Sequence, residues 1–361
     1  MKRVASLFSV VLLGLSIGSV GAAHADTTSP NRYVETDLVS DVPGAAMHTD
    51  PNLVNAWGLT AGPTTPWWVS DNGTDVSTLY DGTGTAIPLV VRVAGAPTGV
   101  VFNGGTGFVV SHEGDFGPAR FLFATESGTI RGWNPAVPSG ASFSTRSFLV
   151  AARRGVGAVF KGLAISGSSE GDLLYATDFH NGRIDVWNSN LQRVHRHDFV
   201  DPTLPDGYAP FGVQAINGHI FVTYAKQVPG SDDEAHGPGL GFVDMFSPEG
   251  AFEGRVASRH ALNAPWGLAW APADFGRFSN DLLVGNFGDG RIIAFAPKAG
   301  GGFERAGILR GTGGVPIVID GLWALEFGNG NAAGPTNSLF FTAGPDDESH
   351  GLFGMINAPM P

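Results

Sequence analysis

Acidic side chains recur at one position of a repeated strand pattern, and these side chains are well suited to chemistry. Each copy of the pattern is an apolar strand that ends in a small residue and then, in most copies, a polar residue. In chain order the last residues are Asp71 (WWVSD), Glu126 (LFATE), Asp178 (LYATD), Tyr224 (FVTY), Asn286 (LVGN) and Ala343 (FFTA). Carboxylate and amide oxygens are the hard ligands that calcium and magnesium prefer, so this column is a candidate cation site.

A second column consists of a glycine that opens a short apolar run. The residues directly before these glycines are Trp57, Thr98, Lys161, Phe211, Trp266 and Asp320. The aromatic members either pack against one another or offer a stacking surface to a sugar or aromatic ligand. Lys161 either pairs with a carboxylate or contacts an anionic substrate.

A third column, a glycine-led strand that ends in an aromatic residue, completes the repeat. Its copies are GTIRGW, GRIDVW, GFVDMF and GRIIAF, with looser versions at DVSTLY and GLFGMI. Turn signals such as HNG at 180–182 and GDG at 288–290 indicate hairpins between the second and third columns. Six ordered copies predict an all-β, six-bladed β-propeller with four-stranded antiparallel blades.

The two ends of the chain indicate how the ring closes. The chain stops just after its sixth third-column strand, at 351–357, whereas residues 33–39 alternate like a strand. We therefore predict that the N-terminal strand completes blade six. Three polar insertions, at 103–120, 227–238 and 344–350, are either solvated decoration or carriers of binding groups.

Composition restricts the partners and the compartment. With 33 acidic against 21 basic residues and a net charge of −12, the chain is poorly suited to nucleic acid or anionic membranes. It contains no cysteine, which excludes thiolate chemistry and disulfides.

Residues 1–25 have the basic start, apolar stretch and Ala23-His24-Ala25 cleavage pattern of a signal peptide. We predict that residues 26–361 form a single propeller domain in the periplasm or outside the cell, a monomer with no membrane span after signal removal.

Propeller geometry brings the first two columns together. The inner strand of each blade runs away from one face and the second strand returns to it, so both columns converge on one end of the central channel, here called the mouth. A ring that contains Asp71, Glu126, Asp178 and Asp320 is costly unless the carboxylates are paired, protonated or bound to a cation. The alternative is that each one hydrogen-bonds turn backbone. Neighbouring candidates are Asn55, Asn72, His180 and Lys226.

The PxG[LV] and L-x-x-[TSG]-[DEN] strands resemble the six-bladed propellers of the NHL-repeat and gluconolactonase/senescence-marker type. The segments NAWGL, FATESGTIRGWN and PWGLA are similar to an uncharacterised family of exported bacterial propellers. The gluconolactonase resemblance implies a divalent cation held near the starts of inner strands. Of that ligand set Asp320, in IDGLW, matches, while Lys161, Phe211 and Trp266 stand where oxygen ligands are expected.

Two functional hypotheses follow. In the first, the mouth is a ligand-binding or interaction module for a small-molecule, carbohydrate or protein ligand. Its contact residues are Trp57, Lys161, Phe211, Tyr224 and Trp266. In the second, the chain is a metal-assisted hydrolase or lactonase. Its cation, calcium or another divalent ion, is held by Asp71, Glu126, Asp178, Asn286 and Asp320, and the base is His180 or one of the carboxylates Glu126 and Asp178.

Overall fold

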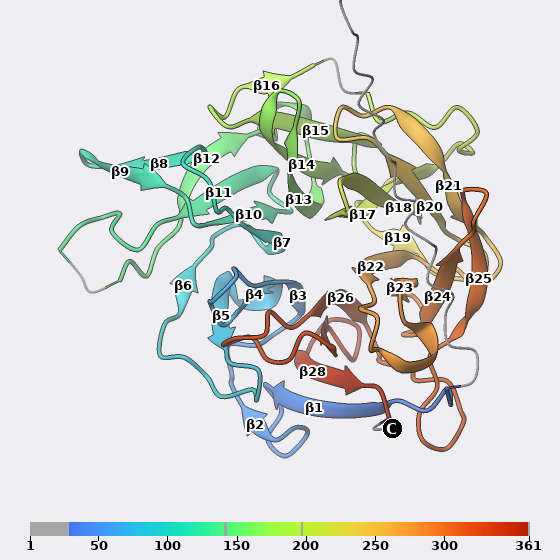
Figure 1. Ribbon diagram of the computed structural model, residues 1–361. Coiled ribbons are helices and arrows are strands. Elements are labelled where there is room, and N and C mark those ends of the chain that lie inside the picture. The colour runs from blue at the N-terminus through green and yellow to red at the C-terminus, as the bar shows by residue number, and fades with distance from the viewer. Residues whose placement is uncertain (1–28, 141–142, 196–197, 360–361) are drawn as a thin grey trace, which may run out of the picture.

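The computed structural model describes residues 29–140, 143–195 and 198–359, and they form six small antiparallel sheets arranged in a ring (Figure 1). The predicted six-bladed β-propeller is therefore confirmed. The predicted signal peptide lies outside the described residues. No helix among the described residues is long and apolar enough to cross a membrane.

In each blade the strands follow one another in chain order from the inner strand outward, except that β1 is the outer strand of blade six. Blade one contains β3 (Ala56–Thr60), β4 (Trp67–Asp71), β5 (Val76–Tyr80) and β6 (Val91–Arg92). Blade two contains β7 (Pro97–Phe102), β10 (Phe121–Thr125), β11 (Thr129–Trp133) and β12 (Phe148–Ala152). Blade three contains β13 (Phe160–Ser168), β14 (Gly171–Asp178), β15 (Arg183–Asn188) and β16 (Arg193–Val194).

The second half of the ring repeats this order. Blade four contains β17 (Tyr208–Ile216), β18 (His219–Gln227), β20 (Phe242–Phe246) and β21 (Phe252–Ser258). Blade five contains β22 (Pro265–Trp270), β23 (Leu282–Asn286), β24 (Ile292–Pro297) and β25 (Phe303–Ile308). Blade six contains β26 (Leu322–Phe327), β27 (Ser338–Ala343), β28 (Leu352–Asn357) and β1 (Val34–Ser40). Short 3-10 turns lie at Asn72–Thr74, Arg154–Val156 and Gly276–Phe278.

The N-terminal strand closes the ring as predicted. Strand β1 pairs antiparallel with β28 from Val34 opposite Asn357 to Ser40 opposite Leu352, and the two strands lie side by side in Figure 1. The short strand β2 (His48–Thr49) extends this sheet. Blade six thus has an outer strand from the opposite end of the chain, and its edge is covered.

The three predicted insertions have different structures. The first forms a hairpin of β8 (Val109–His112) and β9 (Asp115–Pro118). The second contains β19 (Glu234–Ala235), which pairs with the end of β18. The third, 344–350, is a turn at the end of blade six. The second and third insertions both lie at the ends of second strands, on the face of the mouth.

The inner strands approach one another through their backbones. A Cβ added to Gly212 would lie 2.2 Å from the carbonyl oxygen of Trp266, and one added to Gly267 would lie 2.5 Å from that of Trp323. No side chain fits at such distances, which explains why glycine opens the inner strands.

Candidate functional site

A bulge at the same place in every blade aims one inner-strand residue into the channel. The pairing of each inner strand with its neighbour shifts register there, for example between Phe160 and Gly162 in blade three and between Pro265 and Gly267 in blade five. Bulges commonly redirect a side chain in this way. The residues at this position are Trp57, Thr98, Lys161, Phe211, Trp266 and Trp323.

Blade six corrects the predicted column, because Trp323 and not Asp320 occupies the sixth position. Gly321 has φ 63° and belongs to the turn before the strand, whereas Ala324 stands where the other blades have the close-approach glycine. Asp320 is exposed and accepts a hydrogen bond from the backbone of Asp346 at 2.9 Å. The sequence carried a signal for this register, since WAL at 323–325 matches WGL at 57–59 and 266–268.

Aromatic side chains close the channel below the mouth. Trp323 stacks on Trp57 with ring centroids 3.7 Å apart and on Phe287 at 3.9 Å, and it contacts Phe211 and Trp266 at tilted or edge-on angles. We call these five residues the aromatic plug. The side chains of Trp57 and Phe211 are at most 1% exposed, so they serve as packing residues, the first of the two alternatives considered for them. On the far side of the plug the channel holds a cavity of about 20 Å³, room for roughly one water.

A second ring of residues lies at the mouth, one position past Asp71 and its equivalents on the other second strands; in blade four, β18 continues beyond this position to Gln227. The backbone N–H at this position donates to the carbonyl just before the inner strand. Examples are Asn72 to Asn55 at 3.1 Å, Glu126 to Ala96 at 3.0 Å and Phe179 to Val159 at 2.9 Å. The members of this ring are Asn72, Glu126, Phe179, Ala225, Phe287 and Gly344.

The strand-end residues themselves lie inside the blades. Asp71 is fully buried and accepts a hydrogen bond from the backbone of Thr78 at 2.9 Å, and burial raises its pKa well above the usual value. Asp178 accepts from the backbones of Val159 and Asn181 and from the Asn181 amide. These carboxylates bind strand and turn backbone, the alternative considered for this column.

Asn286 and Tyr224 occupy the same strand-end position. Asn286 accepts from the backbone of Asn263 at 3.2 Å and donates to Asp289 at 3.0 Å. Tyr224 is 2% exposed and packs in the core between blades three and four. The structure therefore does not bring Tyr224 to the mouth with Trp266 and Lys161.

Glu126 reaches the mouth because it is the counterpart of Phe179, one position beyond the counterpart of Asp178. Thr125 pairs with Pro97 at the register position where Asp178 pairs with Phe160, so Thr125 is the true counterpart of Asp178. The connecting loop is 126–128 in blade two and 179–182 in blade three. When the segments LFATE and LYATD are aligned in sequence, Glu126 is placed opposite Asp178, and this offset of one residue is not visible.

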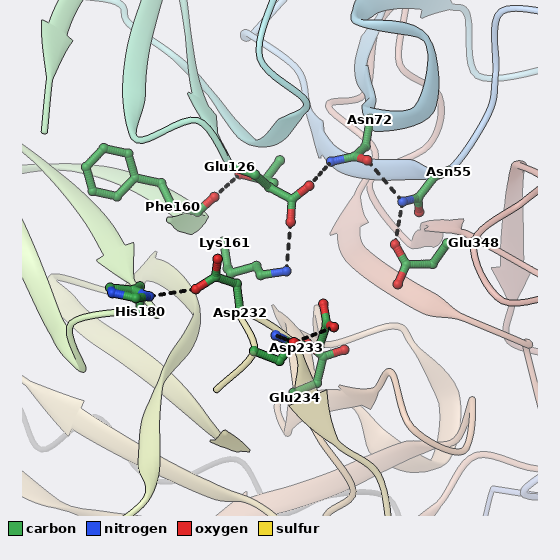
Figure 2. Close-up of polar contacts among 12 residues, drawn as sticks. Asn55, Asn72, Glu126, Phe160, Lys161, His180, Asp232, Asp233, Glu234 and Glu348 are labelled. Atoms are coloured by element: carbon green, nitrogen blue, oxygen red, sulfur yellow. Dashed lines mark hydrogen bonds and ion pairs between the residues drawn. The ribbon is translucent and has the colours of Figure 1, made fainter. Parts of the chain in front are cut away.

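A continuous chain of hydrogen bonds lines the mouth, as Figure 2 shows. Lys161 Nζ lies 2.8 Å from Glu126 Oε1, and Asn72 donates to the other oxygen of Glu126 at 3.0 Å. Asn55 donates to Asn72 at 3.3 Å and to Glu348 Oε2 at 2.6 Å. Lys161 Nζ also lies 5.0 Å above the ring of Trp57, which places the cation directly on the aromatic plug.

Two of the insertions contribute glutamates that sequence reasoning missed. The segments 232–236 (DDEAH) and 346–350 (DDESH) share the pattern D-D-E-x-H. This repeated pattern is the feature of the sequence from which the two glutamates could have been found. Glu234 comes from the loop of blade four and Glu348 from the loop of blade six. Together with Glu126 of blade two, they place carboxylates from alternate blades around Lys161; we call these three residues the glutamate triad.

The loop of blade six presents Glu348 in a strained turn. Asp346, Asp347 and Glu348 have φ values of 60°, 52° and 64°, so three successive residues with side chains adopt the left-handed conformation. Such residues each cost about 1–3 kcal/mol and cluster at functional positions. The turn is held by the bond from Glu348 N to Gly344 O and by Asp320.

The triad controls the charge of the mouth. Burial alone lowers the pKa of Lys161, but Glu126, Glu234 and Glu348 together raise it, so the ammonium stays protonated. Burial and the charge of Glu234 raise the pKa of Glu348. Three carboxylates and one ammonium give these four side chains two net negative charges when all are ionised, which His236, 3.4 Å from Glu234, reduces when it is protonated.

The remaining predicted residues lie at the edge of the mouth or away from it. His180 Nδ1 lies 2.6 Å from Asp232, with both side chains half exposed, and Lys226 lies over the ring of Tyr208. Among the described residues no group of three or more His, Asp or Glu side chains is arranged to hold a metal ion. The predicted cation ligands Asp71, Asp178 and Asn286 are instead engaged by protein groups.

Fold and mouth define a six-bladed β-propeller with one polar, blind channel end. No family model matches the chain. It is 34% identical over 358 residues to uncharacterized protein R648 of Acanthamoeba polyphaga mimivirus. The aligned region covers 94% of this chain and 83% of that protein. It is 32% identical over 349 residues to uncharacterized protein L690 of the same virus, covering 91% and 87%. The chain belongs to the family of these proteins. Because these relatives are viral, the predicted export and bacterial family stay predictions.

Solved structures share the fold at low similarity. A streptogramin B lyase matches with 10% identity and a TM-score of 0.48, covering 91% of this chain and 97% of that one. A glucose dehydrogenase matches with 12% identity and a TM-score of 0.49, covering 91% and 100%. A putative gluconolactonase matches with 13% identity and a TM-score of 0.38, covering 91% and 93%. At these values we draw no functional argument from them.

Proposed function

We propose that the chain is a binding module whose mouth holds a small ligand with an ammonium or guanidinium group. The observation that carries the proposal is the glutamate triad, in which carboxylates from alternate blades converge on one buried ammonium above the aromatic plug. A polar, preorganised set of side chains on a rigid ring is suited to a small molecule.

The charge of the mouth supports a cationic ligand. Lys161 is only 5% exposed and lies behind Glu126, whose side chain is 31% exposed, so the carboxylate is the group offered to solvent. The acidic loops at 232–234 and 346–348 add further negative charge at the rim. Such a field concentrates cations and repels anions.

Isothermal titration with spermidine and argininamide as cations, glucose as a neutral ligand and citrate as an anion tests this proposal. We expect a cation to bind, with Glu126→Gln and Glu348→Gln each weakening affinity at least about tenfold. Glu304→Gln, an exposed change on β25 of blade five, is the matched control and leaves affinity within about twofold. Binding of citrate but neither cation, or equal losses in all three variants, overturns the proposal.

A hydrolase is the second candidate, and the specific observation in its favour is Glu348. A carboxyl whose pKa is raised at a solvent-accessible mouth is suited to donate a proton to a leaving group. A screen of lactones and esters, with Glu348→Gln as the inactive variant, tests this candidate. The predicted calcium is tested in parallel by thermal melting with calcium and with chelator. A calcium-dependent rise in Tm that Glu234→Gln abolishes would assign the triad to a metal instead.

A further inference from the structure

An apolar pocket far from the mouth opens between blades one and two. Its volume is about 460 Å³, within the range of small-molecule sites. Blade one contributes Trp68 of β4, Leu79 of β5 and Leu89 of the following loop. Blade two contributes Phe121 of β10 and Trp133 of β11. The pocket is built from elements of two blades whose mutual position the ring fixes.

The aromatic wall of this pocket is held in place by the protein itself. Trp68 stacks on Phe121 with centroids 4.0 Å apart and lies 4.6 Å from Trp133 at a tilted angle. The indole N–H of Trp133 donates to the carbonyl of Ser144 at 2.7 Å, which fixes that ring. These three side chains are at most 5% exposed. A ligand can therefore pack against the accessible edges of this wall without first ordering its binding site.

One charged residue, Arg120, lines the otherwise apolar pocket. Its guanidinium donates to the carbonyl of Gly105 at 3.3 Å, and among the described residues it pairs with no carboxylate. A partly buried guanidinium without a counter-ion favours a carboxylate, sulfonate or similar anion. The pocket therefore favours an anion, whereas the chain as a whole, with a net charge of −12, favours cations.

From these observations we propose that the pocket between blades one and two binds a small aromatic molecule that carries one anionic group. The ring packs against the accessible edges of Trp68, Phe121 and Trp133, and the anion pairs with Arg120. This site is independent of the triad at the mouth and of the function proposed there.

Two fluorescent probes with the same ring system test the proposal in the full chain. Anilinonaphthalene sulfonate carries the anion, and phenylnaphthylamine lacks it. We expect one molecule of the sulfonate to bind per native chain, with quenching of tryptophan fluorescence. Arg120→Met should weaken the sulfonate about tenfold but change phenylnaphthylamine by less than about twofold. Similar losses for both probes would overturn the role of Arg120.

A pair of adjacent substitutions tests the location. Leu89→Trp fills the pocket and should abolish binding of both probes, whereas Val90→Trp, at an exposed neighbour that does not line the pocket, should leave binding unchanged. Far-UV circular dichroism and Tm check that both variants fold. Equal effects of the two changes, absence of one-to-one binding, or competition by spermidine at the mouth would each overturn the proposal.

Discussion

The two ends of the central channel hold partly buried carboxylates in different ways. At the mouth, Glu126 lies 2.8 Å from the ammonium of Lys161. On the far side of the aromatic plug, Glu326 lines the small cavity and is held by hydrogen bonds from the Ala61 backbone and the Thr60 side chain, with no cation paired to it in the described part of the chain. Burial raises the pKa of Glu326 to about 8.

The comparison shows that the same residue type is tolerated by two mechanisms. A buried carboxylate needs either a nearby cation or a proton. The triad uses the ammonium of Lys161 and keeps its charge, which suits recognition of a charged ligand. Glu326 is protonated near neutral pH, so its carboxyl group is mostly uncharged at that pH. Of the two ends of the channel, the mouth is therefore the one that carries charge for binding a ligand.

Removing the barrier between the two ends has the largest expected effect. Trp323→Ala deletes the centre of the aromatic plug and should lower the free energy of unfolding by about 3–5 kcal/mol. Water that enters the cavity should also reduce the pKa shift of Glu326. Urea denaturation at pH 7 measures the first effect, with Trp270→Phe, a partly exposed site, as the control. A loss below that of the control would show that the plug does not stabilise the ring.

Removing the cation at the mouth comes next. Lys161→Met leaves the triad without its counter-ion and should lower the free energy of unfolding by about 2–4 kcal/mol at pH 7. Acidification to pH 5 should restore part of this loss, because protonation relieves the repulsion among the glutamates. The double variant with Glu126→Gln should lose less than the sum of the single changes. Strict additivity would contradict the coupling of the two side chains.

A strand-end carboxylate provides the reference outside the channel. Asp178→Ala leaves the buried donor of Val159 and the partly buried donor of Asn181 without their acceptor and should cost about 1–3 kcal/mol. Ligand affinity at the mouth should remain unchanged in the folded variant, in contrast to Glu126→Gln. Urea denaturation measures the stability of each variant, and titration of the same preparations measures its ligand affinity. A loss of affinity without a loss of stability would return Asp178 to the binding site.

A pH dependence from Glu326 tests the far end of the channel. Its folded pKa of about 8 exceeds the ordinary 4.5, so between these values the folded state retains a proton that the unfolded state has released. Stability from this residue is therefore fully present below about pH 4.5 and is lost as the pH rises towards 8. Urea midpoints from pH 5 to 8 should fall less steeply in Glu326→Gln than in the parent chain. Identical slopes would contradict the raised pKa.

The sequence columns predicted most of the fold but assigned the carboxylates incorrectly. Repeats identify blades because each blade must supply the same apolar faces and turns. Aligning the repeats in columns, however, requires the corresponding loops to have equal lengths. The loop at 126–128 is one residue shorter than the loop at 179–182. In a strand, a shift of one residue reverses the direction of a side chain. Glu126 therefore faces the mouth while Asp71 and Asp178 face into their blades.

Local periodicity and chain order are enough to predict six blades, the closure by residues 33–39 and the end of the channel to which Glu126 and Lys161 belong. The packing of distant blades, in contrast, brings Trp323 into the plug and Glu234 and Glu348 beside Glu126 around Lys161. Those contacts join residues from different blades, and bulges, loop lengths and a left-handed turn set their directions. Such features leave only weak traces in one sequence, such as the repeated D-D-E-x-H.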